Sequence, residues 1–420
     1  MIVKVGKSIK IPKELVWASW KSVKSNAGSA GIDKQSIADF ETDLSKQLYK
    51  VWNRLSSGSY FPPPVKAVEI PKRSGGKRRL GVPSVADRVA QTVIKALVEP
   101  RLEAVFADDS YGYRPGRSAH DALLVTRERC WQYNWVLEYD IKGLFDNLSH
   151  ELLLQAVKRH VEEKWIVMYI ERWLTAPMIL KDGTELQRTS GTPQGGVISP
   201  VLANLFLHYA IDAWCGRELP GISWCRYADD GLFHCTDKSQ AEYVLQRLTE
   251  RLRQCKLEIH PTKTRIVYCR DDNRKARHEH ESLVFLGLEF RARPAKNKQT
   301  KEIFRSFCPA LGRERLKELR YKVKHEMPIL NRTDLSLDYL ACEINPVIMG
   351  WINYYGKFYP SALRPLVYYI DTRLARWARK KYVRLNRSVA KSRKLIAQIR
   401  DQDPGLFAHW CRYRSLMGAV

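Results

Sequence analysis

The chain has 420 residues, of which 45% are hydrophobic, and a formal net charge of +26 at pH 7. This length suffices for two or three domains, and the charge predicts a polyanionic partner, either nucleic acid or an anionic membrane surface. A membrane-spanning helix is excluded because no apolar run approaches the roughly 18–20 residues that it needs.

The distribution of charge and the cysteine content indicate where the positive surface lies and in which compartment the protein works. Residues 301–420 contain 24 Lys and Arg against 10 Asp and Glu, so the positive charge is concentrated in this part. The nine cysteines show no Cys-x₂-Cys spacing of a zinc site, and their odd number argues against a disulfide framework. We therefore predict a reducing compartment, the bacterial cytoplasm, with an organellar origin as the alternative.

The N-terminal part predicts two helices and a β-hairpin. Residues 12–24 and 37–56 have helical apolar spacing. The segment Lys24–Asp33 between them is too rich in Gly and Ser for a helix and predicts a loop. Residues 65–83 predict two strands joined by a basic turn at 74–76, across which Lys72 and Arg78 face each other.

A helix capped by Ser84 or Asp87 is predicted next. It is followed by a loop shaped by Gly and Pro that carries Tyr113, Arg114 and Arg117, and by a helix that starts near Ser118. Arginines beside aromatic residues suit contact with nucleic-acid backbone and bases. For one of the two arginines, an ion pair that fixes the loop to an acidic neighbour is the alternative.

Three aspartates are predicted at strand ends. A short strand from Val136 carries Asp140 near its end, and the residues around Asp229-Asp230-Gly231 alternate between apolar and polar. Asp-Gly between two such runs predicts a hairpin, with Gly accepting the positive φ of the turn. A solvated turn is the ordinary explanation of Asp-Asp-Gly. Here the flanking strands are predicted to be buried, and a buried carboxylate pair needs a metal ion or a cationic partner.

One aspartate from a strand and two from a neighbouring hairpin would suit a two-metal site for phosphoryl transfer. Such a site uses oxygen ligands around two Mg²⁺ ions about 3.5–4 Å apart. Between these elements, residues 149–175 are predicted to be helical. A loop follows at Gly191–Gly196, where the glycines allow the backbone to approach a ligand, and then a helix over 199–213.

The remaining elements are predicted from periodicity. Residues 238–255 predict an amphipathic helix, 257–267 a strand, a turn and a strand, and 283–290 a closing hairpin. From about residue 305 the pattern becomes helical and basic, with rows of Arg and Lys at 312–325 and 369–387. A charge run of this kind is ordinarily a solvated face.

Three blocks in this order resemble the reverse transcriptase-maturases encoded by bacterial group II introns. They are Asp140–Phe145, Gly191–Asn204 and Tyr227-Ala228-Asp229-Asp230, and the resemblance extends from about residue 12 to residue 385. It implies an α+β right-hand polymerase, whose fingers and palm contain a split βαβ antiparallel sheet and precede an all-helical thumb/maturase domain.

Four regions are predicted on this basis. The predicted regions are an N-terminal extension with fingers at 1–135, a palm at 136–300 with inserted fingers helices at about 149–190, a thumb/maturase (X) domain at 301–385, and a short basic segment at 386–420. This last segment is too short for the zinc-ligating endonuclease that many group II intron proteins carry, so we predict that the endonuclease is absent.

The resemblance implies RNA-directed DNA synthesis with two Mg²⁺ ions and deoxynucleoside triphosphates. Asp140, Asp229 and Asp230 would be catalytic: Asp140 and Asp229 would bridge the two Mg²⁺ ions and Asp230 would complete the site, with Ile141 as a further metal-site residue. Phe145 would exclude a ribose 2′-hydroxyl, and Lys263 would contact phosphate or donate a proton to leaving pyrophosphate. The nucleotide-binding set is Lys72, Arg78, Phe145, Gln194 and Lys263, whose cations would neutralise the triphosphate.

The implied partners are the intron RNA, in a ribonucleoprotein, and target DNA, with no membrane and with dimerisation left open. The protein would assist splicing of its intron RNA, support retrohoming by target-primed cDNA synthesis and associate with the nucleoid. The template- or RNA-binding residues would be Tyr113, Arg114, Arg117, Arg313, Arg320, Arg373, Arg376, Arg379 and Lys380.

Two other functions remain open. One is a reverse transcriptase of another use, including a domesticated or host-repair enzyme without an intron partner. The other is a nucleic-acid-binding protein with an inactive polymerase site, against which the intact Asp140, Asp229 and Asp230 argue.

Overall fold

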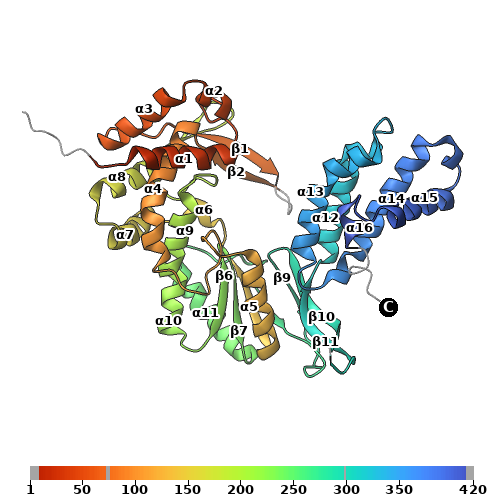
Figure 1. Cartoon of the computed structure of the whole chain (residues 1–420). Helices are drawn as coiled ribbons and strands as arrows, with labels where there is room; N and C mark the ends of the chain where they lie inside the picture. Colours follow the sequence, from red (N-terminus) through yellow and green to blue (C-terminus); the bar gives the residue numbers. More distant parts are fainter. Residues whose placement is uncertain (1–8, 72–75, 298, 413–420) are drawn as a thin grey trace, which may run out of the picture. The chain divides into compact units, whose positions relative to one another are not determined.

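The structure, a computed structural model, describes residues 9–71, 76–297 and 299–412 (Figure 1). The chain forms two compact units. The first comprises the residues up to Ser118 together with Leu137–Arg265, and the second comprises Ala119–Val136 and the residues from Ile266 onward.

The segments of the first unit that were predicted to be helical are helical, but residues 37–56 and residues 149–175 each form two helices. The helices of this unit are α1 (Lys13–Ser25), α2 (Ile37–Thr42), α3 (Leu44–Ser56), α4 (Val85–Glu103), α6 (Leu144–Asn147), α7 (His150–His160), α8 (Lys164–Thr175), α9 (Ser199–Leu207), the π-helical turn η1 (His208–Asp212), α10 (Ala213–Glu218) and α11 (Lys238–Gln254).

Two four-stranded sheets contain the strands of this unit. The first has the order β2-β1-β4-β5 and the second β6-β7-β3-β8; the chain passes between the units within β3 and at the start of β8. The strands are β1 (Val65–Pro71), β2 (Lys77–Val82), β3 (Trp135–Asp140), β4 (Met178–Ile179), β5 (Glu185–Leu186), β6 (Ser223–Tyr227), β7 (Asp230–Cys235) and β8 (Arg265–Tyr268).

The predicted hairpin at 65–83 is confirmed, with β1 and β2 antiparallel and Ile70 opposite Arg78. Lys72 lies outside the described residues. The predicted strand at the start of 257–267 is wrong, because only Ile259 forms an isolated bridge, to Ile141, and regular pairing begins at Arg265. Pro261 explains this, since proline cannot donate to a strand ladder.

Helix α4 runs through the core of the first unit. Ser84 caps its N-terminus by accepting a hydrogen bond from the backbone N–H of Asp87, and Val89, Val93 and Val98 on its apolar face are fully buried. Helices α1, α3 and α9 pack against it.

The helix predicted at 199–213 is present, but its last turn before α10 is π-helical. A π-helical turn shifts the backbone hydrogen bonds by one residue. Here Arg251 Nη2 donates to the carbonyl oxygen of Tyr209 at 3.0 Å and Arg251 Nε to that of Ala210 at 3.1 Å. The turn is thereby stabilised from a neighbouring helix.

The second unit combines helices with a three-stranded sheet of order β11-β10-β9. Its elements are α5 (Ala119–Gln132), β9 (Ser282–Phe285), β10 (Leu288–Lys296), β11 (Ile303–Ala310), α12 (Arg313–His325), η2 (Pro328–Asn331), α13 (Leu337–Tyr355), η3 (Pro360–Leu363), α14 (Arg364–Lys381), η4 (Val383–Leu385), α15 (Val389–Gln402) and α16 (Ala408–Cys411).

The expectation that residues after 301 are all helical is wrong, because β11 pairs with β10 along its whole length, from Glu289 opposite Ala310 to Lys296 opposite Ile303. Aromatic and β-branched residues such as Ile303 and Phe307 favour this strand. The helices predicted at 312–325 and 369–387 are α12 and α14. No helix in the described part of the chain is both long and apolar enough to cross a membrane.

Candidate active site

The hairpin that carries two aspartates forms as predicted, but its turn differs. Strands β6 and β7 are antiparallel, and their last pair is Tyr227 with Asp230, so Ala228 and Asp229 make the turn. The positive φ, 56°, belongs to Ala228 and not to Gly231. Gly231 lies within β7, where a Cβ atom would fall 2.2 Å from Cζ of Tyr139. The glycine is therefore required for close packing.

Asp140 ends β3, the strand beside β7. Its backbone carbonyl accepts a hydrogen bond of 2.8 Å from the N–H of His260. Its side chain is 13% exposed, and Oδ2 accepts a hydrogen bond of 2.7 Å from Nζ of Lys263. The sheet thus places Asp140 at the end of β3, next to β7, the strand that begins with Asp230.

The three carboxylates interact electrostatically. Burial raises the pKa of Asp229, and the charge of Asp140 raises it further. Burial, followed by the charges of Asp229 and Asp140, raises the pKa of Asp230 to about 7. Burial lowers the pKa of Lys263, but its hydrogen bond to Asp140 and the charges of all three carboxylates outweigh this, so the net shift is upward. This cluster of negative charge has Lys263 as its nearest counterion.

The cluster has the donor type and charge that Mg²⁺ prefers. Carboxylate oxygens are hard ligands, and a divalent cation would relieve the repulsion that raises the pKa values of Asp229 and Asp230. Within the residues that the structure describes, no group of three or more His, Cys, Asp or Glu side chains is arranged to hold a metal ion. The side chains therefore fit a metal in chemistry without forming a complete coordination shell.

Two predicted nucleotide-binding residues lie together. Arg78 Nε, on β2, donates a hydrogen bond to Oε1 of Gln194. The loop of Gln194 is fixed to β2, because the N–H of Gly81 donates to the carbonyl oxygen of Gln194 at 2.8 Å. Gly195 has a φ of 120°, and a Cβ there would lie 2.5 Å from the carbonyl oxygen of Gly81. The predicted loop is confirmed, and its close backbone approach is to strand β2; the approach to a ligand stays a prediction.

Phe145, in α6, touches the same loop through its backbone. Its carbonyl oxygen accepts a hydrogen bond of 2.7 Å from the N–H of Thr192. Gly191, with a φ of 77°, leaves no room for a Cβ, which would lie 2.6 Å from that oxygen. Phe145 is 9% exposed. The helix after Asp140 and the loop of Gln194 are thus one packed structure.

Tyr113 lies beside the carboxylates. Its φ is 57° and it is 52% exposed. Burial raises the pKa of its hydroxyl, followed by the charge of Asp229. The preceding residue is Gly112, and a Cβ atom on it would lie only 2.5 Å from the backbone nitrogen of Ala228. The loop around Tyr113 is therefore in contact with the Ala228–Asp229 turn.

The template contact predicted for Arg114 does not fit its position. Its guanidinium is 3% exposed and pairs with Glu103 at 2.6 Å, and it donates to the carbonyl oxygens of Ala107 and Ser110. This is the structural alternative that the sequence left open. Arg117 is more accessible, at 28% exposed, and pairs with Asp108 at 2.8 Å.

The basic residues predicted to bind RNA in the second unit differ in their exposure and in their hydrogen-bond partners. Arg313, Arg376 and Lys380 are exposed, and Arg379 is half-buried. Arg320 donates to the carbonyl oxygen of Pro365 at 3.0 Å. For Arg373, which is 8% exposed and donates to Asn331 Oδ1 at 3.1 Å, the position argues against RNA contact.

Two charged residues were not predicted from the sequence: Arg226, which donates a hydrogen bond to the carbonyl oxygen of Ala228, and its partner Asp212. Both side chains are 0% exposed, and they form an ion pair with an N···O distance of 2.5 Å. Their signal in the sequence was weak but present: Arg226 lies in a run of apolar residues that otherwise predicts a buried strand.

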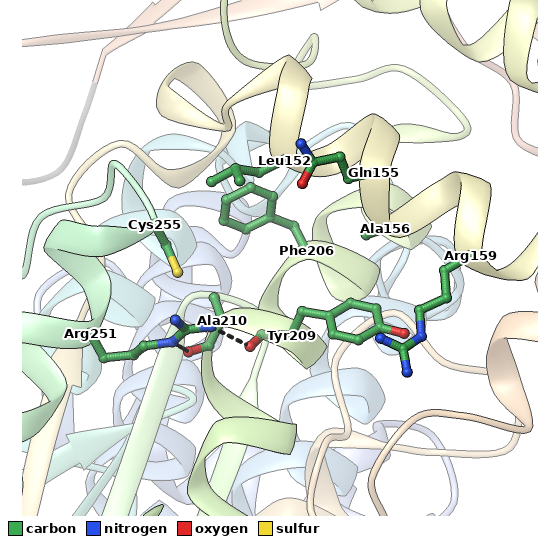
Figure 2. Close-up of a pocket in the computed structure, with 9 residues that line it drawn as sticks. All are labelled: Leu152, Gln155, Ala156, Arg159, Phe206, Tyr209, Ala210, Arg251 and Cys255. Atoms are coloured by element: carbon green, nitrogen blue, oxygen red, sulfur yellow. Dashed lines mark hydrogen bonds between the residues drawn. The ribbon is translucent and has the colours of Figure 1, made fainter.

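A separate pocket of ≈ 250 Å³ lies between α7, η1 and the end of α11 (Figure 2). The ring of Tyr209 extends toward Arg159, whose guanidinium lies 5.6 Å from the ring centroid. None of the predicted site residues is among those that line the pocket, so it is distinct from the carboxylate cluster. Its lining residues are Leu152, Gln155, Ala156, Arg159, Phe206, Tyr209, Ala210, Arg251 and Cys255.

The sequence of the chain matches two family models. Residues 70–290 match the model described as reverse transcriptase (RNA-dependent DNA polymerase), and residues 316–395 match that of the group II intron, maturase-specific domain. The chain belongs to the reverse transcriptase family and, within it, to the group II intron-encoded reverse transcriptases with a maturase domain. The resemblance inferred from the three sequence blocks is confirmed.

Two relatives illustrate the similarity. The group II intron-encoded protein LtrA of Lactococcus lactis subsp. cremoris is 33% identical over 199 residues, which are 46% of this chain and 32% of that protein. Protein YkfC of Escherichia coli (strain K12) is 30% identical over 282 residues, 58% of this chain and 74% of that protein. The match thus spans about a third of the length of LtrA.

Among solved structures, apo telomerase from Candida Tropicalis truncated from C-terminal domain aligns with a TM-score of 0.43 and 14% identity. The alignment covers 58% of this chain and 55% of that one.

Proposed function

We propose that this protein is an RNA-directed DNA polymerase that also binds group II intron RNA as a maturase. The observation that carries the proposal is that Asp140 ends the strand next to the hairpin of Asp229 and Asp230, with Lys263 as counterion. In this proposal the first 135 residues form an N-terminal extension and fingers, 136–300 the palm and 301–385 the thumb/maturase domain.

Two Mg²⁺ ions would be held by Asp140, Asp229 and Asp230, with Ile141 adjoining. When bound, such ions activate the primer 3′-hydroxyl and stabilise the charge of the leaving pyrophosphate. The raised pKa of Lys263 keeps its ammonium protonated, so it is available to contact phosphate or to donate a proton to the leaving group.

The protein's own residues would orient the incoming deoxynucleoside triphosphate. Arg78 and Gln194, already joined by a hydrogen bond, would hold its phosphates and sugar beside the carboxylates, where positive charge offsets the charge that develops on the phosphates. Phe145 would stand against the 2′ position of the sugar, since a ring there leaves no room for a hydroxyl.

The maturase role would use the basic surface of the second unit. Arg313, Arg376 and Lys380 are exposed and suit the phosphates of intron RNA. The maturase-specific match at 316–395 supports intron RNA as the partner over a repair role without an intron. Target DNA would be the second partner, with cDNA synthesis primed at the target during retrohoming in a bacterial cytoplasm.

Primer extension on an RNA template tests the enzymatic part. Asp229→Asn should abolish extension and leave RNA binding near the wild-type level, because the change removes one charge and keeps the shape. Asp182→Asn is the matched control: this carboxylate lies in an exposed turn and accepts a bond from the N–H of Thr184. Extension by Asp229→Asn within a few-fold of wild type would refute the proposed site.

A further inference from the structure

The buried guanidinium of Arg226 uses its whole hydrogen-bonding capacity. Nε donates to Asp212 Oδ1 at 2.8 Å and Nη2 to Asp212 Oδ2 at 2.5 Å. Nη2 also donates to Ser110 Oγ at 2.8 Å, and Nη1 donates to Asn204 Oδ1 at 3.1 Å and to the carbonyl oxygen of Ala228 at 3.2 Å. An arginine has five N–H donors, so each of them has an acceptor.

These acceptors come from four separate segments: η1, α9, the loop before α5 and the Ala228–Asp229 turn. The contact with Ala228 is the one nearest to the chemistry, because Asp229 follows directly. Ala228 has a left-handed φ of 56°, a conformation that a residue with a Cβ disfavours. A hydrogen bond to its carbonyl oxygen holds the peptide that leads into Asp229.

The loop before α5 is fixed to the same strand by its backbone. The N–H of Tyr111 donates to the carbonyl oxygen of Arg226, and the N–H of Arg226 to that of Asp109, both at 2.9 Å. Asn204 completes the link, since Nδ2 donates to the carbonyl oxygen of Gly112 at 2.6 Å. The residue that this loop presents next is Tyr113.

A buried ion pair contributes little net stability compared with apolar side chains of the same size, because both charges lose their hydration. What it contributes is a defined geometry. Arg226 and Asp212 are both 0% exposed, and the groups that they join are the loop of Tyr113 and the turn of Asp229. The buried ion pair thus lies where the loop of Tyr113 and the turn of Asp229 are held together.

We propose that Arg226 is a positioning residue that holds the 110–113 loop against the Ala228–Asp229 turn, so that Tyr113 contacts the incoming nucleotide or primer end beside the carboxylates. This inference deepens the proposed polymerase function and rests on it. It also revises the role of Tyr113, which the sequence assigned to the template.

Hydrogen exchange of the whole protein tests the tether without relying on catalysis. Arg226→Lys keeps the charge but has three donors and no planar fork. The amides of Tyr111 and Arg226 should then exchange about tenfold faster or more, with α8 unchanged. Arg188→Lys is the matched control, since Arg188 is partly buried and donates to two carbonyl oxygens, of Ala176 and Trp173. Unchanged exchange at Tyr111 and Arg226 would overturn the proposal.

Kinetics of the same variants separate positioning from loss of folding. Measured below the unfolding transition, Arg226→Lys should lower kcat by about tenfold or more with the Kd for primer-template unchanged, whereas Arg188→Lys should lower only the melting temperature. Tyr113→Ala should raise KM for the nucleotide in the wild type and have a smaller effect in Arg226→Lys. Fully additive effects would refute the coupling.

The two proposals fail in different ways. A wild-type protein that does not extend primers refutes the polymerase function, and the positioning of a nucleotide contact falls with it. Normal extension by wild type, with equal kcat for Arg226→Lys, refutes the positioning role alone.

Discussion

Nζ of Lys263 lies 2.7 Å from Oδ2 of Asp140 and donates a hydrogen bond to it. Lys263 lies in the turn that begins at Pro261, and Asp140 ends a strand more than a hundred residues earlier. The lysine is therefore part of the carboxylate cluster itself, and its charge lowers the pKa values of Asp229 and Asp230 against the effects of burial and repulsion.

Removing this charge should shift the pH dependence of activity. In the metal-free protein, Lys263→Met should raise the pKa of Asp230 above its value of about 7. Protons should then compete with Mg²⁺ up to a higher pH, so the acid limb of the pH–rate profile for primer extension at limiting Mg²⁺ should move to higher pH. Raising the pH should then restore part of the lost rate. Lys263→Arg, which keeps the charge, should leave the limb in place. An unmoved limb in Lys263→Met would show that this charge does not act on the carboxylates.

Sugar selection should depend on the ring of Phe145. Phe145→Ala should lower the ratio of kcat/KM for deoxynucleotides over ribonucleotides by about tenfold or more, because the space for a 2′-hydroxyl opens. Phe145→Tyr retains the ring and should keep the ratio near that of wild type. Single-nucleotide incorporation measures both, and equal ratios in all three proteins would exclude Phe145 as the selecting residue.

The two arginines of the 110–117 loop should behave differently. Arg114→Ala removes the buried partner of Glu103, whose side chain is 26% exposed, and of the carbonyl oxygens of Ala107 and Ser110. This is expected to cost about 1–3 kcal/mol in the free energy of unfolding. Arg117→Ala removes a more exposed pair and should change stability far less. Urea unfolding measures this difference. Affinity for primer-template should fall in Arg117→Ala if that residue contacts nucleic acid; reversed results would mean that Arg114 is not structural.

The basic helices should contribute to the salt dependence of RNA binding. Replacing Arg313, Arg376 and Lys380 with Ala should reduce the slope of log affinity against log salt by up to about 0.7–0.9 for each phosphate that is no longer neutralised. Arg373→Ala, on the same helix as Arg376 but buried, should leave the slope unchanged while lowering the melting temperature. If the triple substitution leaves the slope unchanged, these residues do not contact RNA and are only solvated surface residues.

Local patterns in the sequence predicted most elements and the three aspartates because strands, turns and polar positions follow short-range rules. What they missed depends on partners far away in the chain. Gly231 was assigned to the turn because Asp-Gly favours one, whereas the ring of Tyr139 is the reason for the glycine. Arg114 has the same signal as a nucleic-acid contact until Glu103 is seen beside it. The strand at 303–310 has residues that favour a strand, but its partner β10 cannot be predicted from local propensity.

The π-helical turn η1 gives the chain one residue of tolerance in its length at this point. Such a turn holds one more residue than an α-helix of the same path, and Asp212 is its last residue. Deleting a single residue from 208–211 should therefore let an ordinary α-helix follow the same path, with the carboxylate of Asp212 still facing Arg226. Inserting a residue there should do the opposite, because one more residue turns Asp212 by about 100° around the helix axis. The Ala228–Asp229 turn would then lose the support of Arg226 without any change in the aspartates themselves.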